Sequence, residues 1–572
     1  MWERQEDKSK YAFYSTAKKI LKESPCDTTY PIKDKNGKIL TQTKEKLQEF
    51  ANLYKEIHSP PPATVESTET EATCKAYYAQ ISEKYAEIKE REPTQKIDQT
   101  VTILKMKTQL AKAKNTSPGA DGIHYTHLKN LPDIALQYLA KLYETSWRCA
   151  YFPDMWKEAT VILLPKPEKD KTQPKNYRPI SLLPTMGKLF ERLINDEIMK
   201  QLESENRLPE SQAGFRAKRS TQDQLLKMMQ DAIQAKNTGQ TLVSTMFDIE
   251  KAYDKIWHEA AVYKFHKIGL EEQMVALLKN YLTNRNLQIR IKGELSEKVT
   301  LRAGTPQGAI LSPTIFNICV HDIPQPKPSA RLSQFADDIA SWAKARNELD
   351  ARDRLQAYND VITAWCRKWR IILAPAKTQL IYVHRGKNSR ADISNPNAIH
   401  QKINGVKVEA KKEAIFLGVT LDKCMNMTAH FNKMLKEVRK RRKNFMRVTG
   451  SHTKPRASTE ISLKILKSMI ESVLLYAPVI TTLLKDHQCE QLDTEIRMCA
   501  RLALHAPFNM RSEYIVEKAN LKPIRETLSR IAKKYITSEE RSSSVKEYVN
   551  RFLQNRTTCK WKVKSPLHVL RG

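Results

Sequence analysis

The sequence lacks paired cysteines and long hydrophobic segments. Its nine cysteines are odd in number and none belongs to a Cys-x-x-Cys pair, which argues against a disulfide framework and a zinc knuckle and favours a reducing compartment. No apolar stretch near the first residue resembles a signal peptide. The most apolar stretch, 473–484, contains Pro478 and is shorter than the ~20 residues that cross a bilayer. We therefore expect an intracellular protein of the nucleus or the cytoplasm, with no membrane partner.

Acidic residues are also scarce relative to basic ones. The chain of 572 residues contains 97 Lys and Arg against 64 Asp and Glu, a formal net charge of +33. Such an excess repels itself in a compact protein unless a polyanion neutralises it, and nucleic acid is the obvious polyanion. A generally basic surface without such a partner is the alternative that composition leaves open. The length predicts about two to four packed subdomains.

Periodicity and turn residues divide the chain into four regions: a helical extension over 1–110, a main region over 111–425, a helical region over 426–535 and a tail over 536–572. Prolines at 59–63 interrupt the extension, because proline removes backbone donors. We expect strands at 159–167, 241–247, 335–343 and 378–383, a hairpin at 287–302, helices at 128–151, 250–265 and 346–369, and almost only helices beyond 431.

Two adjacent carboxylates interrupt an apolar stretch. Asp337 and Asp338 lie between Phe335, Ile339 and Trp342. An isolated Asp-Asp pair is most often a hairpin turn, because Asp tolerates turn backbone angles. Here the apolar flanks would hold two like charges on a buried strand-turn-strand platform, where unpaired charges are costly. A divalent cation such as Mg²⁺, which prefers oxygen ligands, removes both costs.

A third carboxylate ends another expected strand. Asp248 directly follows the apolar stretch 241–247. Because Asp248 and Asp337 are far apart along the chain, only a shared sheet can bring them together. A metal site built from these acids is therefore also a prediction about the fold.

Five segments, two of which contain these acids, resemble in order the fingers and palm motifs of reverse transcriptases, in the variant of non-LTR, jockey-like retrotransposons. They are YRPISLLPTMGKLFERLI (177–194), SQAGFRAKRSTQDQLL (211–226), FDIEKAYDKIWH (247–258), AGTPQGAILSP (303–313) and FADDIA (335–340). SPGADGI before them, and LAPAKTQLIYV and IFLGVTLD after them, are similar to flanking motifs of that family. The resemblance covers roughly residues 100–425. It implies an α+β right-hand polymerase with fingers, a palm with an antiparallel sheet, and a helical thumb.

The resemblance also implies a metal site and a nucleotide gate. Asp248, Asp337 and Asp338 would hold two Mg²⁺ ions, for which Mn²⁺ could substitute, with the Ile249 carbonyl as a further ligand. Tyr253 would be a steric gate, a ring that leaves no room for a ribose 2′-hydroxyl. An ordinary packed tyrosine on the following helix is the alternative for Tyr253.

Further motifs imply contacts with the incoming nucleotide. Gln307 and Gly308 of GTPQG would approach the nucleotide, and Gln307 could hydrogen-bond its sugar. Lys166 and Arg178 match fingers positions that bind the triphosphate. Lys377 resembles a general acid that protonates pyrophosphate. A helix-start loop and ordinary surface cations are the alternatives for these residues.

Contacts with the template and primer are implied on both sides of the palm motifs. Arg216, Lys218 and Arg219 of GFRAKRS fit the template backbone, and Gly418 fits a turn near the primer. The expected helix at 430–448 would pack one apolar face on the palm and bind duplex with cations that include Lys436 and Lys440. A solvated basic face and a nuclear-localisation patch at 439–443 are the alternatives. Asp254 is interpreted as structural.

These expectations describe an RNA-directed DNA polymerase from a mobile element. Its partners would be an RNA template, a DNA primer, their RNA–DNA duplex and deoxynucleoside triphosphates. The alternatives are a catalytically inactive or co-opted RNA-binding protein derived from such an element, and a relative of group II intron maturases. About 110 residues precede SPGADG, too few for an endonuclease domain, so we expect a fragment or truncated copy that holds the polymerase module.

Overall fold

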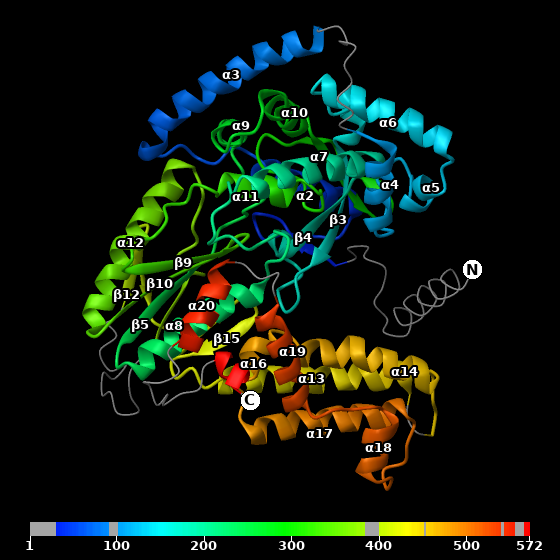
Figure 1. The fold of residues 1–572 in the computed structure, drawn as a ribbon. Coiled ribbons are helices and arrows are strands. Elements are labelled where there is room, and N and C mark those ends of the chain that lie inside the picture. Colours follow the sequence, from blue (N-terminus) through cyan, green and yellow to red (C-terminus); the bar gives the residue numbers. More distant parts are fainter. Residues whose placement is uncertain are drawn as a thin grey trace.

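The computed structural model describes residues 30–90, 101–383, 400–450, 453–538, 543–554 and 566–571. The chain folds as mixed helix and sheet, with helices around two main sheets and a separate group of C-terminal helices (Figure 1). The expected extension and tail are thus described only in part, and Cys26 and Cys559 lie outside the described residues.

A four-stranded antiparallel sheet contains the segments that end in the expected metal ligands. Its order is β11–β5–β10–β9. The strands are β5 (Thr241–Phe247), β9 (Ala330–Phe335), β10 (Asp338–Ala345) and β11 (Gln379–Val383). The strands expected at 241–247 and 378–383 are confirmed. The strand expected at 335–343 corresponds in part to β10, and 336–337 form the turn of the strand-turn-strand arrangement expected around the two acids.

Helices cover both faces of this sheet, and every residue of β5 is buried. Leu242 and Met246 pack with α8 (Thr221–Asn237) in one hydrophobic core. Val243 and Phe247 pack with α12 (Glu348–Lys368) in another. Burial on both faces explains why β5 has apolar residues on each face and does not alternate strictly between apolar and polar residues.

A second sheet lies beside the first, and a helix from the N-terminal part of the chain packs against it. Its order is β4–β3–β6–β7, with β8 also paired to β6, from β3 (Glu158–Pro165), β4 (Tyr177–Leu182), β6 (Asn286–Ile291), β7 (Glu294–Leu295) and β8 (Val299–Thr300). The hairpin expected at 287–302 is confirmed. Helix α2 (Thr43–Ile57) packs Leu47, Phe50 and Tyr54 into the core of this sheet. Residues 43–57 are therefore an integral part of the fold.

A helical layer covers the remaining sides of the sheets. It consists of α3 (Thr68–Glu90), α4 (Ile103–Lys112), α5 (Tyr125–Lys129), α6 (Asp133–Arg148), α7 (Thr185–Ser204), α9 (His258–Lys267), α10 (Glu272–Leu282) and α11 (Ser312–Cys319). The helix expected over 250–265 is wrong at its start, since α9 begins only at His258. Residues 250–257 form turns whose backbone groups bond other segments, such as the Glu250 amide that donates to the Ile372 carbonyl (2.8 Å).

The C-terminal region is helical, as expected, after the hairpin of β14 (Glu413–Phe416) and β15 (Val419–Asp422). Its longest helix, α13 (Thr428–Thr449), buries Phe431, Met434 and Val438 and exposes Lys436 and Lys440. The amphipathic helix expected at 430–448 is confirmed. In Figure 1, α13, α14 and α17 lie together, apart from the four-stranded sheet. The other elements here are α14 (Thr459–Leu466), η4 (Lys467–Glu471), α15 (Ser472–Leu474), α16 (Pro478–Thr481), α17 (Asp486–Ala503), α18 (Ser512–Lys518) and α19 (Ile524–Thr537).

The described part of the tail returns to the four-stranded sheet. Helix α20 (Ser543–Gln554) and η6 (Pro566–Arg571) pack against α8. The Tyr548 hydroxyl donates to Asp231 on α8 (3.0 Å), and the Tyr535 hydroxyl donates to Asp223 (2.6 Å). Two tyrosines therefore tie the C-terminal helices to the helix beneath the sheet.

The remaining elements are short. They are β1 (Ile32–Lys33), β2 (Ile39–Leu40), β12 (His400–Ile403), β13 (Val406–Glu409), η1 (Val65–Ser67), η2 (Asp154–Trp156) and η3 (Pro174–Asn176). Among the described residues, no helix is both long enough and apolar enough to span a membrane.

Candidate active site

Three carboxylates lie at one end of the four-stranded sheet. Asp248 directly follows β5, and the pairing of Phe247 with Ile339 sets Asp338 next to it on the neighbouring strand. Phe335 pairs with Asp338 across the β9–β10 hairpin, so Asp337 lies in the hairpin turn at the same end. The shared sheet that the sequence required is present, and strand register brings the distant acids together.

The pKa values of Asp337 and Asp338 are raised in the folded chain. Partial loss of hydration and the charges of Asp337 and Asp248 raise the pKa of Asp338 to about 6. The pKa of Asp337 is also raised, chiefly by loss of hydration and further by Asp248. Like charges close together favour protonation or a bound cation. The carboxylates are therefore close enough for the charge of one to change the pKa of another.

No group of three or more His, Cys, Asp or Glu side chains in the described residues is placed to hold a metal ion. The acids are thus not preassembled as a closed site. Their donor chemistry nevertheless fits a hard divalent cation such as Mg²⁺, which takes carboxylate oxygens and keeps waters and phosphates in its shell. The charge of Asp248 raises the pKa of both Asp337 and Asp338, which is the electrostatic sign of a site that a cation would stabilise.

One cation, Lys377, lies beside these acids, and further cations lie near it. The Lys377 ammonium lies 3.3 Å from an Asp248 carboxylate oxygen, and both side chains are largely exposed. Burial lowers the pKa of Lys166, and the nearby charges of Lys377 and Arg178 lower it further. Three of the cations expected near the nucleotide, Lys166, Arg178 and Lys377, are therefore brought together in space, although they come from different parts of the sequence.

The segment after Asp248 is bonded to the GTPQG loop. The Thr305 amide donates to the Tyr253 carbonyl (2.8 Å), and the Gly304 amide donates to the Ile256 carbonyl (2.8 Å). Tyr253 lies in the turns before α9 and not on a helix, and its ring packs 5.2 Å from that of Phe316. Burial and the charges of Asp337 and Asp338 raise the pKa of Tyr253. The ring thus lies close to the carboxylates.

Asp254 determines how the Gln307 side chain is oriented. The carboxylate is buried and accepts hydrogen bonds from the Gln307 amide nitrogen at 2.9 and 3.1 Å. Because a carboxylate only accepts, the amide nitrogen faces Asp254 and the amide oxygen is directed elsewhere. Burial raises the pKa of Asp254, while the neighbouring His58 opposes that rise. Gly308, next in the loop, is exposed.

His58 brings the N-terminal region into this site, which the sequence did not indicate. Its ring nitrogen lies 3.1 Å from the Ala303 carbonyl, and its own carbonyl accepts from the amides of Arg302 and Ala303. The start of the GTPQG segment is therefore held by the residue that follows α2. No local signal around the prolines at 59–63 predicts a contact with residue 303.

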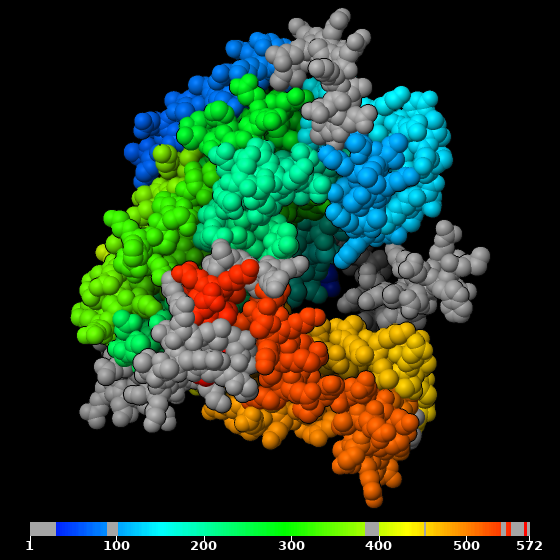
Figure 2. Space-filling model, viewed as in Figure 1, coloured from blue at the N-terminus to red at the C-terminus, as the bar shows by residue number. Residues whose placement is uncertain are grey.

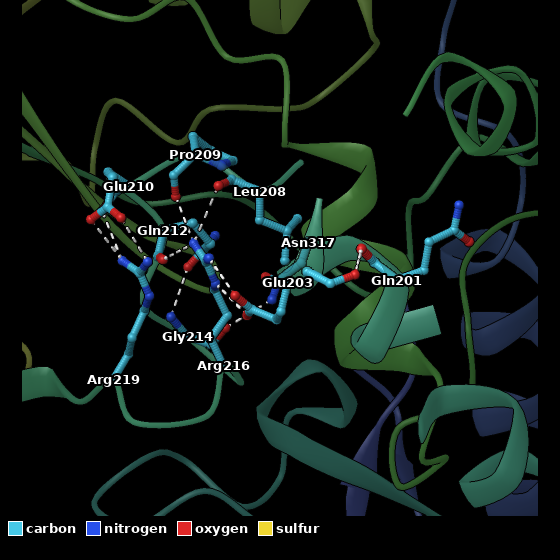
Figure 3. Close-up of polar contacts among 11 residues, drawn as sticks. Gln201, Glu203, Leu208, Pro209, Glu210, Gln212, Gly214, Arg216, Arg219 and Asn317 are labelled. Atoms are coloured by element: carbon cyan, nitrogen blue, oxygen red, sulfur yellow. Dashed lines mark hydrogen bonds and ion pairs between the residues drawn. The ribbon is translucent and has the colours of Figure 1, made fainter. Parts of the chain in front are cut away.

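The arginines of GFRAKRS face inward. The Arg216 guanidinium is 2% exposed, bonds both Glu203 carboxylate oxygens (2.8 Å each) and donates to the carbonyls of Pro209 (2.8 Å) and Gln212 (3.0 Å). Arg219 pairs with the Glu210 carboxylate (2.9 Å). Figure 3 shows both arginines turned toward these partners. The expectation that Arg216 contacts the template backbone is therefore wrong, because its donors are used inside the protein. Lys218 is exposed.

A groove of about 530 Å³ lies along α13. Gly418, Lys436, Lys440 and Tyr476 line it, together with Glu168 from the loop between β3 and β4. Gly418 has a φ of +78°, and a side chain there would crowd the Tyr476 ring, whose hydroxyl donates to the Leu417 carbonyl (2.7 Å). Three residues expected to contact template or primer thus share one groove. Figure 2 shows the C-terminal region that contains α13 in yellow and orange.

Comparison with known proteins agrees with this arrangement. Residues 164–421 match the family described as reverse transcriptase (RNA-dependent DNA polymerase). This part of the chain is therefore similar to reverse transcriptases. The match contains the three acids, the GTPQG loop, Lys377 and Gly418.

Relatives of the reverse transcriptase region come from non-LTR mobile elements. The RNA-directed DNA polymerase from mobile element jockey of Drosophila funebris is 29% identical over 448 residues, and that of Drosophila melanogaster is 27% identical over 445. Each alignment covers 76% of this chain and 47% of the relative, so the chain spans about half the length of the curated relatives it matches. Among solved structures, telomerase from Candida tropicalis in complex with a fragment of telomeric RNA has a TM-score of 0.35 at 11% identity, covering 74% of this chain and 68% of that chain.

Proposed function

We propose that this chain is an RNA-directed DNA polymerase that adds deoxynucleotides to a primer 3′-hydroxyl, and that it derives from a non-LTR, jockey-like mobile element. The observation that carries the proposal is the meeting of Asp248, Asp337 and Asp338 at one sheet end, with Lys377 beside Asp248 and with Lys166 near both Lys377 and Arg178. Anionic groups that hold divalent cations, facing cations that hold phosphates, are what phosphoryl transfer needs. We expect the protein to act in the nucleus or the cytoplasm.

The acids would hold two metal ions together with the Ile249 carbonyl. Two bound Mg²⁺ ions, or Mn²⁺ in their place, supply the charge that lowers the pKa of the attacking hydroxyl and stabilises the leaving pyrophosphate. The chain itself contributes position, because β5 and the β9–β10 hairpin fix where each carboxylate lies. Lys377, which lies beside Asp248, would donate a proton to the leaving group.

The triphosphate and sugar would lie between the acids and the cations. Arg178 offers a planar fork of donors and Lys166 a compact charge, which suits them to different oxygens of one triphosphate. Tyr253 would exclude a 2′-hydroxyl by the bulk of its ring, which is supported from behind by Phe316. Gln307 would present its amide oxygen, since Asp254 binds the amide nitrogen. Gly308 would allow the backbone to approach the nucleotide.

Template and primer would lie across the palm and against α13. In this proposal the β3–β4–β6 sheet belongs to the fingers, the β11–β5–β10–β9 sheet is the palm, and α13 with its neighbours is the thumb. Lys436, Lys440 and Gly418 line the groove that would receive the RNA–DNA duplex, and Lys218 would contact a strand from the palm side. Cations that neutralise phosphates release counterions, so binding should weaken steeply with salt.

The decisive experiment is primer extension on poly(rA)/oligo(dT) with Mg²⁺ and dTTP, with Asp337→Asn as the matched variant. We expect extension by the unaltered protein and none by Asp337→Asn, with equal duplex affinity for both. Duplex binding without extension by the unaltered protein would contradict the polymerase and favour a co-opted RNA-binding protein.

A further inference from the structure

A phenylalanine is exposed beside the turn that carries Asp337. Phe215, in the loop 211–219, is 54% exposed, and its backbone φ is +57°. A left-handed backbone is unfavourable for a bulky residue and persists only where the surrounding structure imposes it. Phe215 therefore contributes little to the core, yet the fold holds it in a costly conformation.

The residue before Phe215 is in direct contact with the catalytic turn. A Cβ on Gly214 would lie 2.3 Å from the Ala336 nitrogen, so only glycine allows this approach. The Gln212 side-chain oxygen accepts from the amides of both Gly214 (2.9 Å) and Ala336 (3.0 Å). The Gln212 side chain thus holds both Gly214, which precedes Phe215, and Ala336, which precedes Asp337.

The loop that carries Phe215 is an extension of the palm sheet. The Ala213 amide donates to the Gln334 carbonyl (2.9 Å), and the Gln334 amide donates to the Ser211 carbonyl (2.8 Å). On the other side of Phe215, the buried Arg216 fixes the chain through Glu203 and backbone carbonyls. Figure 3 shows Gln212, Gly214 and Arg216 as one bonded group. Phe215 is therefore an exposed ring on a rigid support.

Lys218, in the same loop, is also an exposed residue with a left-handed backbone. Its φ is +60°, and it lies two residues beyond the buried Arg216. Within the loop, the arginines expected to bind nucleic acid point inward, while a flat aromatic ring and an ammonium group point outward. A ring that stacks on any base, beside a cation for its phosphate, is a general arrangement for sequence-tolerant nucleic-acid binding.

We propose that Phe215 stacks on a nucleobase next to the primer terminus and that Lys218 contacts the adjoining phosphate. This inference rests on the proposed polymerase function, which puts the primer terminus at the Asp337 turn. A nucleobase is the expected occupant because the site must accept every sequence in turn, and stacking does not discriminate among bases. The pair would hold the primer–template in register with the carboxylates.

The test is duplex affinity, measured by fluorescence anisotropy with a labelled primer–template, because it does not depend on turnover. Phe215→Ala should weaken binding about tenfold, since one base stack is worth about that factor. Phe215→Trp should bind as the unaltered protein does, and Phe215→Leu, which keeps bulk without a π face, should resemble Phe215→Ala. Phe508→Ala, which removes a 94% exposed ring in the C-terminal region, is the matched control and should change nothing.

Abasic sites locate the stacked base. One abasic substitution near the primer terminus should weaken binding by the unaltered protein to the level of Phe215→Ala, and should not weaken Phe215→Ala further. Lys218→Ala should reduce the slope of log affinity against log salt by about 1, whereas Phe215→Ala should leave the slope unchanged. Melting temperatures of all variants should match, since both side chains are exposed.

Primer extension by the unaltered protein separates this inference from the proposed function. If the unaltered protein extends primers while Phe215→Ala binds duplex normally, or if Phe215→Leu binds as well as Phe215→Trp, stacking by Phe215 is overturned and the polymerase stands. If the unaltered protein extends nothing, the polymerase is overturned, and the abasic comparison still decides whether Phe215 stacks on a base.

Discussion

The turn at Asp337 and the loop 211–219 lie in contact, yet the positions of their side chains have different causes. In the turn, charged residues stand where the pattern indicated, at the ends of β5 and β10, because strand register alone sets their place. In the loop, Arg216 is buried while Phe215 is exposed, the reverse of the usual preference of these residue types. A position fixed by backbone pairing can be predicted from pattern, whereas a position fixed by side-chain partners cannot.

The largest effect should come from the acids. We expect Asp248→Asn to lower kcat by about 10³-fold or more, since it removes a metal ligand and its charge from the reacting groups. Steady-state primer extension measures this, and Asp360→Asn, which neutralises an exposed carboxylate on α12, is the control. Equal losses for both variants would mean that the strand-end position of Asp248 has no special role.

The buried arginine should matter to folding and not to nucleic acid. Arg216→Ala should lower the free energy of unfolding by about 3 kcal/mol, because it leaves Glu203 and buried carbonyls without their partner. Arg219→Ala, whose partner Glu210 is 52% exposed, should cost about 1 kcal/mol or less. Urea unfolding compares the two. If Arg216→Ala is as stable as the unaltered protein but its duplex affinity depends less on salt, Arg216 contacts nucleic acid and does not stabilise the fold.

The Asp254–Gln307 pair is a third case in which a side-chain partner sets the orientation of a residue, here one expected to contact the nucleotide. Asp254→Asn lets the amide turn over, so we expect the KM for dNTP to rise about tenfold, with a smaller change in kcat. Gln307→Ala should raise KM similarly, and the double variant should be no worse than either single one, because Asp254 acts through Gln307. Additive effects on KM would show that the two residues act independently.

The smallest effect concerns the pH dependence of metal-free protein. The pKa of Asp338 is raised to about 6 in the folded chain, above its unfolded value of about 4. The folded state therefore holds this proton more tightly, and stability should fall as pH rises from about 4 through about 6. Solvent screening limits the change to about 1 kcal/mol. Thermal melts at several pH values measure it. If Asp338→Asn leaves the dependence of melting temperature on pH unchanged, Asp338 is not the group responsible.

Much of the fold and part of the site could be predicted from the sequence. β5, β11, α12 and the amphipathic α13 follow from local apolar periodicity, and the acids follow from where the apolar runs end. The start of α9 was misplaced because residues 250–257 give their backbone hydrogen bonds to the 303–305 and 372 segments. Apolar periodicity is a local signal, so it cannot indicate that distant segments take the backbone hydrogen bonds that a helix would need.

The missed residues share that cause. His58 reaches Ala303, and Tyr476 reaches Leu417, each across a long stretch of sequence. Arg216 finds Glu203 on α7, and nothing in GFRAKRS distinguishes that inward arginine from an outward one. In each case the side-chain type was visible, but the partner that decides its role was not.

The most direct test of the central claim counts metal ions by the EPR signal of Mn²⁺. The complex would contain protein, a primer that ends in a 3′-deoxynucleotide, template and dNTP, so that no reaction occurs. The account predicts two bound Mn²⁺ in the unaltered complex and weaker, incomplete binding in Asp248→Asn and Asp337→Asn alike, because both acids belong to one site. Unchanged Mn²⁺ number and affinity in either variant would contradict it.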